Sequence, residues 1–88
     1  MWAEVEVSGA VTRLEGPLLF LERTVNAGLN EAVEVVGADD RVRLGRVAAL
    51  DEHVITIEVL ESTTGLGLAE TRIRFRGEPL HFSVGPDI

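Results

Sequence analysis

Apolar and polar residues alternate with period two along most of this chain. The clearest run spans His53 to Leu60, where Ile55, Ile57 and Val59 share one face and polar residues occupy the other. No window of a dozen residues keeps the three-and-four spacing of a helix. The pattern therefore predicts antiparallel strands with one buried and one wet face. Similar alternation is found in Glu4–Val7, Ala32–Val36 and Thr71–Arg76.

Glycines mark the places where this alternation changes. The apolar parity shifts after Gly9 and again after Gly45, so we expect a bend or β-bulge at each. Gly37–Asp40 has the composition of a hairpin turn, and Asp51–Glu52 closes another. About six short strands separated by turn signals predict an all-β fold, a small closed six-stranded antiparallel β-barrel.

Two segments complete the predicted strands. Leu18–Leu21 is apolar on both faces, so one face needs a cover other than the core. That cover is either the loop Arg23–Asn30 or, in an assembly, a neighbouring subunit. At the other end of the sequence, Gly77–Pro79 is expected to turn into a final short strand, in which Leu80, Phe82 and Val84 point one way.

Composition narrows the class of protein. With 88 residues the chain forms one domain with a modest core. It has no cysteine, which excludes disulfides and thiolate metal sites, and its net charge of −7 is the wrong sign for nucleic-acid binding. Its apolar runs are far shorter than the roughly 20 residues of a membrane-spanning helix. The acidic N-terminus is unlike a secretory signal, so we expect a cytoplasmic protein.

Few residues suggest chemistry. His53 and His81 stand alone, without acidic or cysteine partners at metal-ligand spacing. Ser62–Thr64 lacks the surroundings of an activated nucleophile and is expected to form a turn held by hydroxyl-to-backbone hydrogen bonds. The glycines of Thr64–Leu68 do not make a phosphate-binding loop, because the chain contains no lysine. We therefore expect no catalytic residue, metal, cofactor or bound nucleotide in this domain.

A row of arginines is the one constellation that favours an interaction surface. Arg72, Arg74 and Arg76 alternate with Ile73 and Phe75 and are expected on the outer face. They either dock an acidic neighbour or form cross-strand ion pairs of modest energy. Candidate carboxylates for such pairs are Glu34, Glu58 and Glu61.

Three segments together resemble a known family. Gly16–Glu22 reads G-P-L-L-F-L-E, Glu61–Leu66 reads E-S-T-T-G-L, and Thr71–Leu80 reads T-R-I-R-F-R-G-E-P-L. In this order and spacing they resemble the N-terminal β-barrel domain of the non-catalytic B subunit of V-type and A-type rotary ATPases. The family patterns are G-P-L-(L/V)-F-V-E, E-x-T-T-G-L and T-x-V-R-F-x-G-E-x-L. The resemblance extends from about Val7 to Asp87.

This resemblance implies a structural role in an ion-translocating ATPase or ATP synthase. In the family, the barrel is the first of three domains, so the nucleotide-binding and helical domains are not expected within residues 1–88. Barrels of A and B subunits form a crown that holds the hexamer, and the B-subunit barrel meets the peripheral stalk. The domain would belong to the ATPase head, peripheral to the membrane. Candidate subunit-interface residues are Leu19, Leu21, Thr63, Thr64, Gly65, Leu66, Arg72, Arg74 and Arg76.

Departures from the pattern leave alternatives open. Asn26–Glu31 stands where the family often has V-A-Y-G-E, and Val84–Asp87 partly resembles the L-G-P of the catalytic A subunit. The alternatives are the N-terminal domain of an A subunit, a flagellar or secretion ATPase relative, and a freestanding small barrel that binds a ligand or protein. The sequence does not specify proton or sodium transport, the direction of ATP chemistry, or self-association.

Overall fold

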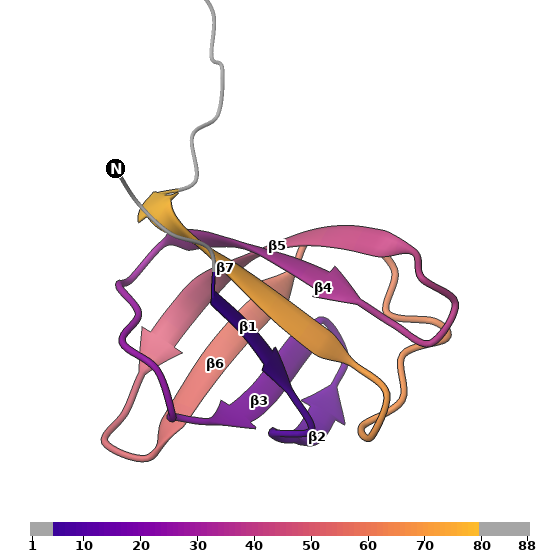
Figure 1. The fold of residues 1–88 in the computed structure, drawn as a ribbon, viewed down its shortest axis with the longest axis horizontal. Coiled ribbons are helices and arrows are strands. Elements are labelled where there is room, and N and C mark those ends of the chain that lie inside the picture. Colours follow the sequence, from indigo (N-terminus) through magenta and orange to yellow (C-terminus); the bar gives the residue numbers. More distant parts are fainter. Residues whose placement is uncertain (1–4, 80–88) are drawn as a thin grey trace, which may run out of the picture.

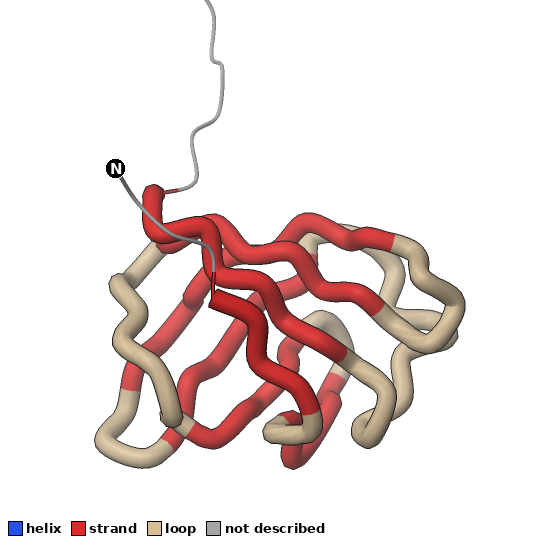
Figure 2. The backbone as a smooth tube through the Cα atoms, in the orientation of Figure 1, coloured by secondary structure: helices blue, strands red, loops and turns tan. Residues whose placement is uncertain are grey.

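The computed structural model describes residues 5–79 (Figure 1). Strands and loops make up this part of the chain, as Figure 2 shows. Within it, no helix is long and apolar enough to cross a membrane. The strands are β1 (Val5–Ser8), β2 (Val11–Glu15), β3 (Leu18–Glu22), β4 (Glu31–Val36), β5 (Val42–Leu50), β6 (Val54–Val59) and β7 (Arg72–Pro79).

The strands form one antiparallel sheet in the order β1-β7-β4-β5-β6-β3-β2. The sheet curls so that β1, β7 and β4 lie across from β6, β3 and β2, with β5 joining the two sides (Figure 1). Within residues 5–79 no ladder pairs the edge strands β1 and β2. The all-β antiparallel fold is confirmed. The closed six-stranded barrel is not, because the described residues form seven strands in an open half-barrel.

The core lies on the concave side of the curled sheet. The predicted inward positions of β6 and β7 are confirmed, since their apolar side chains have almost no exposed surface. Alternate residues of these strands are buried because successive side chains of a strand point to opposite faces of the sheet. The buried cluster comprises Val11, Leu19, Leu21, Val33, Val35, Val47, Ile55, Ile57, Val59, Ile73 and Phe75.

The parity change at Gly9 is a corner between two strands. β1 ends at Ser8, Gly9 adopts a positive φ of 73°, and β2 starts at Val11 on the opposite edge of the sheet. The bulge itself lies farther along, between Val11 and Arg13. A hydrogen bond from the Glu22 N–H to the Ala10 carbonyl, 3.0 Å long, ties this corner to the end of β3.

The irregularity predicted in β5 is present, but it lies farther along the strand than Gly45. Arg43, Gly45 and Val47 all face the core, and the register shifts between Val47 and Ala49. Gly45 sits where neighbouring backbone comes close, because a Cβ built there would lie 2.9 Å from the Glu58 carbonyl oxygen. Without a side chain at this inward position, β5 keeps its alternation through the glycine.

The end of β7 also differs from prediction. Gly77–Pro79 does not turn, because β7 continues to Pro79, which pairs with Glu31 of β4. A register shift between Glu31 and Val33 accommodates this longer pairing. The predicted last strand at 80–84 and His81 lie outside the described residues.

The space around Gly45 gives a test of this packing. Gly45→Ala is expected to lower the free energy of unfolding by about 1–3 kcal/mol, because backbone must move to admit the methyl group. Gly28→Ala is the matched control, since a Cβ there meets nothing within 4 Å. Its effect should stay within about 0.5 kcal/mol. Urea unfolding measures both, and equal losses would contradict the close packing of β5.

Candidate functional site

Two of the segments that carry the family resemblance meet at one end of the half-barrel. The Thr63 hydroxyl donates to the Gly16 carbonyl at 3.3 Å. Beside it, the Val59 N–H donates to the Pro17 carbonyl at 2.8 Å. The loop after β6 is therefore fixed against the turn that precedes β3.

A buried arginine lies beneath this loop. Arg43 is on the inward face of β5, opposite Val35, and has no exposed surface. Its Nε–H donates to the Ser62 carbonyl at 3.0 Å, and its Nη2 donates to the Thr64 carbonyl at 2.8 Å. One side chain thus supplies donors to two carbonyls of a loop that has no strand beside it.

Asp39 completes the network from the turn between β4 and β5. Arg43 Nη2 lies 3.1 Å from Asp39 Oδ2, and Nη1 lies 3.5 Å from Oδ1. Nη1 also donates to the Arg41 carbonyl at 3.1 Å. These contacts account for the five N–H donors of a guanidinium, which satisfies the demand of a buried charge. We call Arg43, Asp39, Ser62 and Thr64 the Arg43 clamp.

The loop over the clamp has the turn expected from its sequence. The Thr64 N–H donates to the Ser62 hydroxyl at 3.2 Å, which confirms the predicted hydroxyl-to-backbone turn. Gly65 has a φ of 91°, a conformation that glycine adopts without strain. Leu66 then packs against the core, and its N–H donates to the Thr63 carbonyl at 3.1 Å.

The predicted interface residues fall into different environments. Leu19 and Leu21 have no exposed surface, so their side chains belong to the core of this chain. The outward side chains of this strand are Leu18 and Phe20, both half-buried. The Arg13 guanidinium lies 4.6 Å from the centre of the Phe20 ring, so this chain supplies part of the cover itself. In the loop, Thr64 and Gly65 are exposed, whereas Thr63 and Leu66 are half-buried.

The arginine row of β7 lies on the outer face and forms ion pairs with carboxylates of β4 and of the turn that follows it. Arg74 and Arg76 contact the Glu34 carboxylate at 3.2 and 2.9 Å. Arg72 contacts Asp40 at 2.9 Å. The row is therefore partly neutralised by carboxylates of its own chain, and Glu34 is one of the partners expected from the sequence.

The other two expected carboxylates have different partners. Glu58 pairs with Arg46 of β5 at 2.8 Å. Glu61 accepts a hydrogen bond from the Leu44 N–H at 2.9 Å. In this way Glu61 adds a second contact between β5 and the residues that follow β6, next to the backbone hydrogen bond from the Leu60 N–H to the Leu44 carbonyl.

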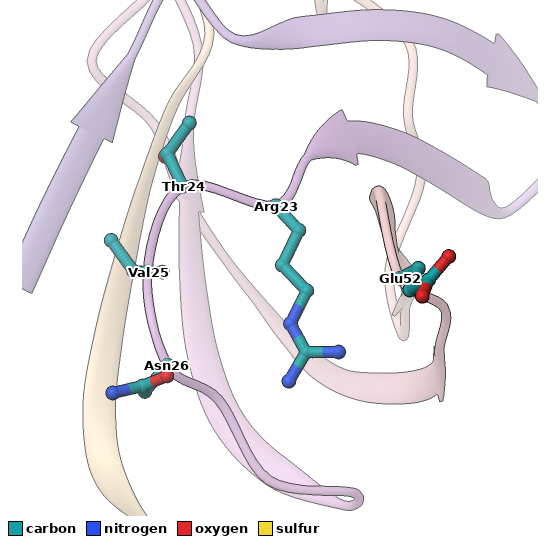
Figure 3. A pocket seen from close by; sticks show the side chains of 5 residues that line it. All are labelled: Arg23, Thr24, Val25, Asn26 and Glu52. Carbon is teal, nitrogen blue, oxygen red and sulfur yellow. The ribbon is translucent and has the colours of Figure 1, made fainter.

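A recess formed by the loop after β3 and the β5–β6 hairpin, away from the Arg43 clamp, is lined mainly by polar groups (Figure 3). Arg23 runs between the loop that carries Asn26 and the β5–β6 hairpin that carries Glu52. Its Nη1 donates to the Asp51 carbonyl at 2.8 Å. The cation of this recess is thus used to hold the hairpin, and the recess does not favour a ligand site.

Sequence reasoning missed Arg43. An arginine between Val42 and Leu44 in an alternating strand reads as an outward residue, and its loop partners lie about twenty residues away. The available signal was indirect. The alternation of Arg43, Gly45 and Val47 places the arginine on the same face as a core valine, four residues after an aspartate.

The Arg43 clamp predicts a large stability effect. Arg43→Leu is expected to cost about 3 kcal/mol or more, because the loop carbonyls of Ser62 and Thr64 lose their donors. Arg46→Leu, which breaks a half-exposed ion pair with Glu58, should cost less than about 1 kcal/mol. Chemical unfolding of the two variants compares them directly. Similar costs would show that the clamp does not hold the loop.

The clamp also predicts a dependence on pH. Hydrogen bonds from the Arg43 guanidinium and then from the Arg41 N–H hold the pKa of Asp39 below its ordinary value of 3.8. Because the pKa of Asp39 is lower in the folded state, its carboxylate stabilises the fold at pH values above the ordinary pKa. This contribution is lost as the pH falls through the lowered pKa. The stability difference between the wild type and Asp39→Asn should therefore be present at neutral pH and shrink in acid. Urea midpoints across the acid range measure it, and a constant difference would exclude this role of Asp39.

Comparison with known proteins identifies the same family as the three sequence segments. The family model described as "ATP synthase alpha/beta family, beta-barrel domain" matches residues 5–77. B subunit 1 of the A-type ATP synthase from Methanospirillum hungatei is 37% identical over 78 residues, which are 89% of this chain and 17% of that protein. The V-type ATP synthase beta chain of Thermotoga neapolitana is 33% identical over 78 residues, with the same shares covered.

A third relative gives the same picture. The V-type ATP synthase beta chain 2 of Clostridium tetani is 37% identical over 76 residues, which are 86% of this chain and 16% of the relative. The chain thus spans 16–17% of the length of these relatives. The chain belongs to the ATP synthase alpha/beta family, whose β-barrel domain it carries, and within that family it resembles the N-terminal domain of the B subunit.

Proposed function

We propose that this chain is an assembly domain of the B subunit of an A-type or V-type ATP synthase. Residues 1–88 act as one domain that joins the barrels of neighbouring A subunits in a crown and meets the peripheral stalk. The domain takes part in no step of ATP chemistry and binds no nucleotide by itself. Ion transport and ATP turnover belong to other parts of the complex.

The Arg43 clamp is the observation that carries this proposal. It is the most extensive polar network among the described residues, and the hydrogen-bond donors of Arg43 are directed at Asp39, Arg41, Ser62 and Thr64. A catalytic or ligand-binding cation keeps donors available for its substrate. Here the donors fix the shape of a loop, which is a structural task.

A fixed loop suits a contact between subunits. Thr64 and Gly65 are exposed, and the carbonyls of Ser62 and Thr64 are held from beneath. Ordering a loop before binding removes part of the entropic cost of association. We include in the proposal that the half-barrel closes in the assembled complex, with β1 and β2, already joined by two residues, meeting at the seam.

Association with the A subunit tests the proposal. Light scattering of this chain alone and mixed with the purified A subunit of the same ATP synthase should give a monomer and a heterocomplex, with a dissociation constant in the micromolar range typical of a small interface, about 10⁻⁶ M. An excess of A subunit and buffer of low ionic strength favour detection.

Two outcomes would overturn this function. No heterocomplex at concentrations of A subunit about a hundred times that constant would remove the assembly role. A tight complex of this chain with itself, unaffected by the A subunit, would instead favour an independent binding module.

A further inference from the structure

We propose that three outward side chains, Val42 and Leu44 of β5 and Leu60 directly after β6, form the docking surface for a basic partner. We call them the β5–β6 patch. The partner is a neighbouring subunit that presents apolar side chains flanked by lysine or arginine. This inference rests on the proposed function and names the surface and the chemistry of the contact.

The three side chains are contiguous. Gly45 pairs with Val59, so the next residues outward, Leu44 and Leu60, are opposite one another, and the Leu60 N–H donates to the Leu44 carbonyl at 2.8 Å. Val42 lies two residues from Leu44 on the same face of β5. Their exposed fractions are 48% for Val42, 40% for Leu44 and 38% for Leu60.

Clustering separates the β5–β6 patch from other exposed apolar residues. Among the side chains that the structure describes, the remaining large exposed ones are Leu29 and Leu68. Leu29 lies in the loop between β3 and β4 and Leu68 in the loop between β6 and β7, whereas Leu60 directly follows β6 and lies opposite Leu44. Single exposed apolar residues are ordinary on protein surfaces, whereas a contiguous group on a sheet face is typical of an interaction site.

The alternation of β5 is inverted where the β5–β6 patch lies. An arginine occupies the inward position between Val42 and Leu44, and the two apolar residues face out. A soluble strand with one wet face has the opposite arrangement. Such a local conflict with the fold is expected at functional sites.

Contacts on two sides hold the β5–β6 patch in place. The Glu61 carboxylate accepts from the Leu44 N–H at 2.9 Å, next to Leu60 in the chain. Just beyond, the Arg43 clamp holds the carbonyls of Ser62 and Thr64. The position of Leu60 beside Leu44 is therefore set before any partner binds, and association need not order it.

Ion-paired residues lie beside the apolar centre. Glu34 of β4 is paired in register with Leu44, and Arg46 follows Leu44 on the same face. Arg46 contacts Glu58 of β6, two residues before Leu60, at 2.8 Å. An apolar centre depleted of charge within a polar rim is the usual anatomy of a protein interface.

Charge indicates what kind of partner covers this surface. The chain has a net charge of −7, so a second copy would meet long-range repulsion. Glu61 is exposed beside Leu60 and forms no ion pair among the described residues, although its carboxylate accepts from Leu44. A cation at this point of the partner would complement it. The occupant is therefore a basic surface of another subunit.

Matched variants of the 88-residue chain test the β5–β6 patch in calorimetric titrations with the purified A subunit. The double variant Leu44→Thr/Leu60→Thr should bind at least tenfold more weakly, because it removes apolar contact area and leaves strand-forming side chains. Leu29→Thr is the control, since Leu29 is exposed and lies in the loop between β3 and β4, and it should bind within about twofold of the wild type. Urea midpoints verify that all variants are folded.

The charge of the partner has its own readout. Glu61→Asp keeps the carboxylate and should bind like the wild type, whereas Glu61→Arg should bind several-fold more weakly and show a smaller loss of affinity with added salt. Equal affinity of Glu61→Arg and Glu61→Asp would overturn the basic partner. Self-association of the wild type that the double variant abolishes would also overturn it, in favour of a second copy.

These outcomes separate the inference from the function on which it rests. If the wild type binds the A subunit and the double variant binds equally well, the β5–β6 patch is not the docking surface, and the assembly role stands. If the wild type does not bind at all, both the assembly role and the partner named here are overturned.

Discussion

The buried guanidinium of Arg43 is the interaction on which one end of the half-barrel depends. A charge in the interior is tolerated only when its hydrogen bonds are satisfied, and here Asp39 and the carbonyls of Ser62 and Thr64 satisfy them. The loop in turn receives donors that no strand provides. The charge and the loop therefore require each other, and the end of the barrel is closed by a side chain in place of backbone pairing.

The register of β5 connects this clamp to the outer surface. Because side chains alternate, placing Arg43 inward places Val42 and Leu44 outward. A slip of one residue would bury both apolar side chains and expose the arginine, but it would also put Arg46 where Val47 packs. Gly45 supports the observed register, since its missing side chain leaves room for the backbone of Glu58. One register thus fixes both the internal network and the external surface.

The sequence predicts best where local pattern and burial agree. β6 and the first part of β7 are read correctly because Ile55, Ile57 and Ile73 alternate with polar residues and end in the core. β5 is misread because its inward arginine has the pattern of an exposed residue, and its partners come from a distant loop. The continuation of β7 to Pro79 depends on pairing with Glu31, which no local signal reveals. The errors occur where long-range contacts override local composition.

The residues that carry the family resemblance are explained by geometry. Thr63 binds the Gly16 carbonyl, Thr64 presents its own carbonyl to Arg43, and Gly65 adopts a φ that suits glycine. Each residue of the T-T-G motif supports the shape of this loop. The resemblance in these segments therefore reflects the same loop structure at one end of the half-barrel. A shared fold does not by itself establish function. Function has to be argued from the surfaces that the loop and β5 hold in place, which is why an inverted alternation on β5 carries more information than the motifs themselves.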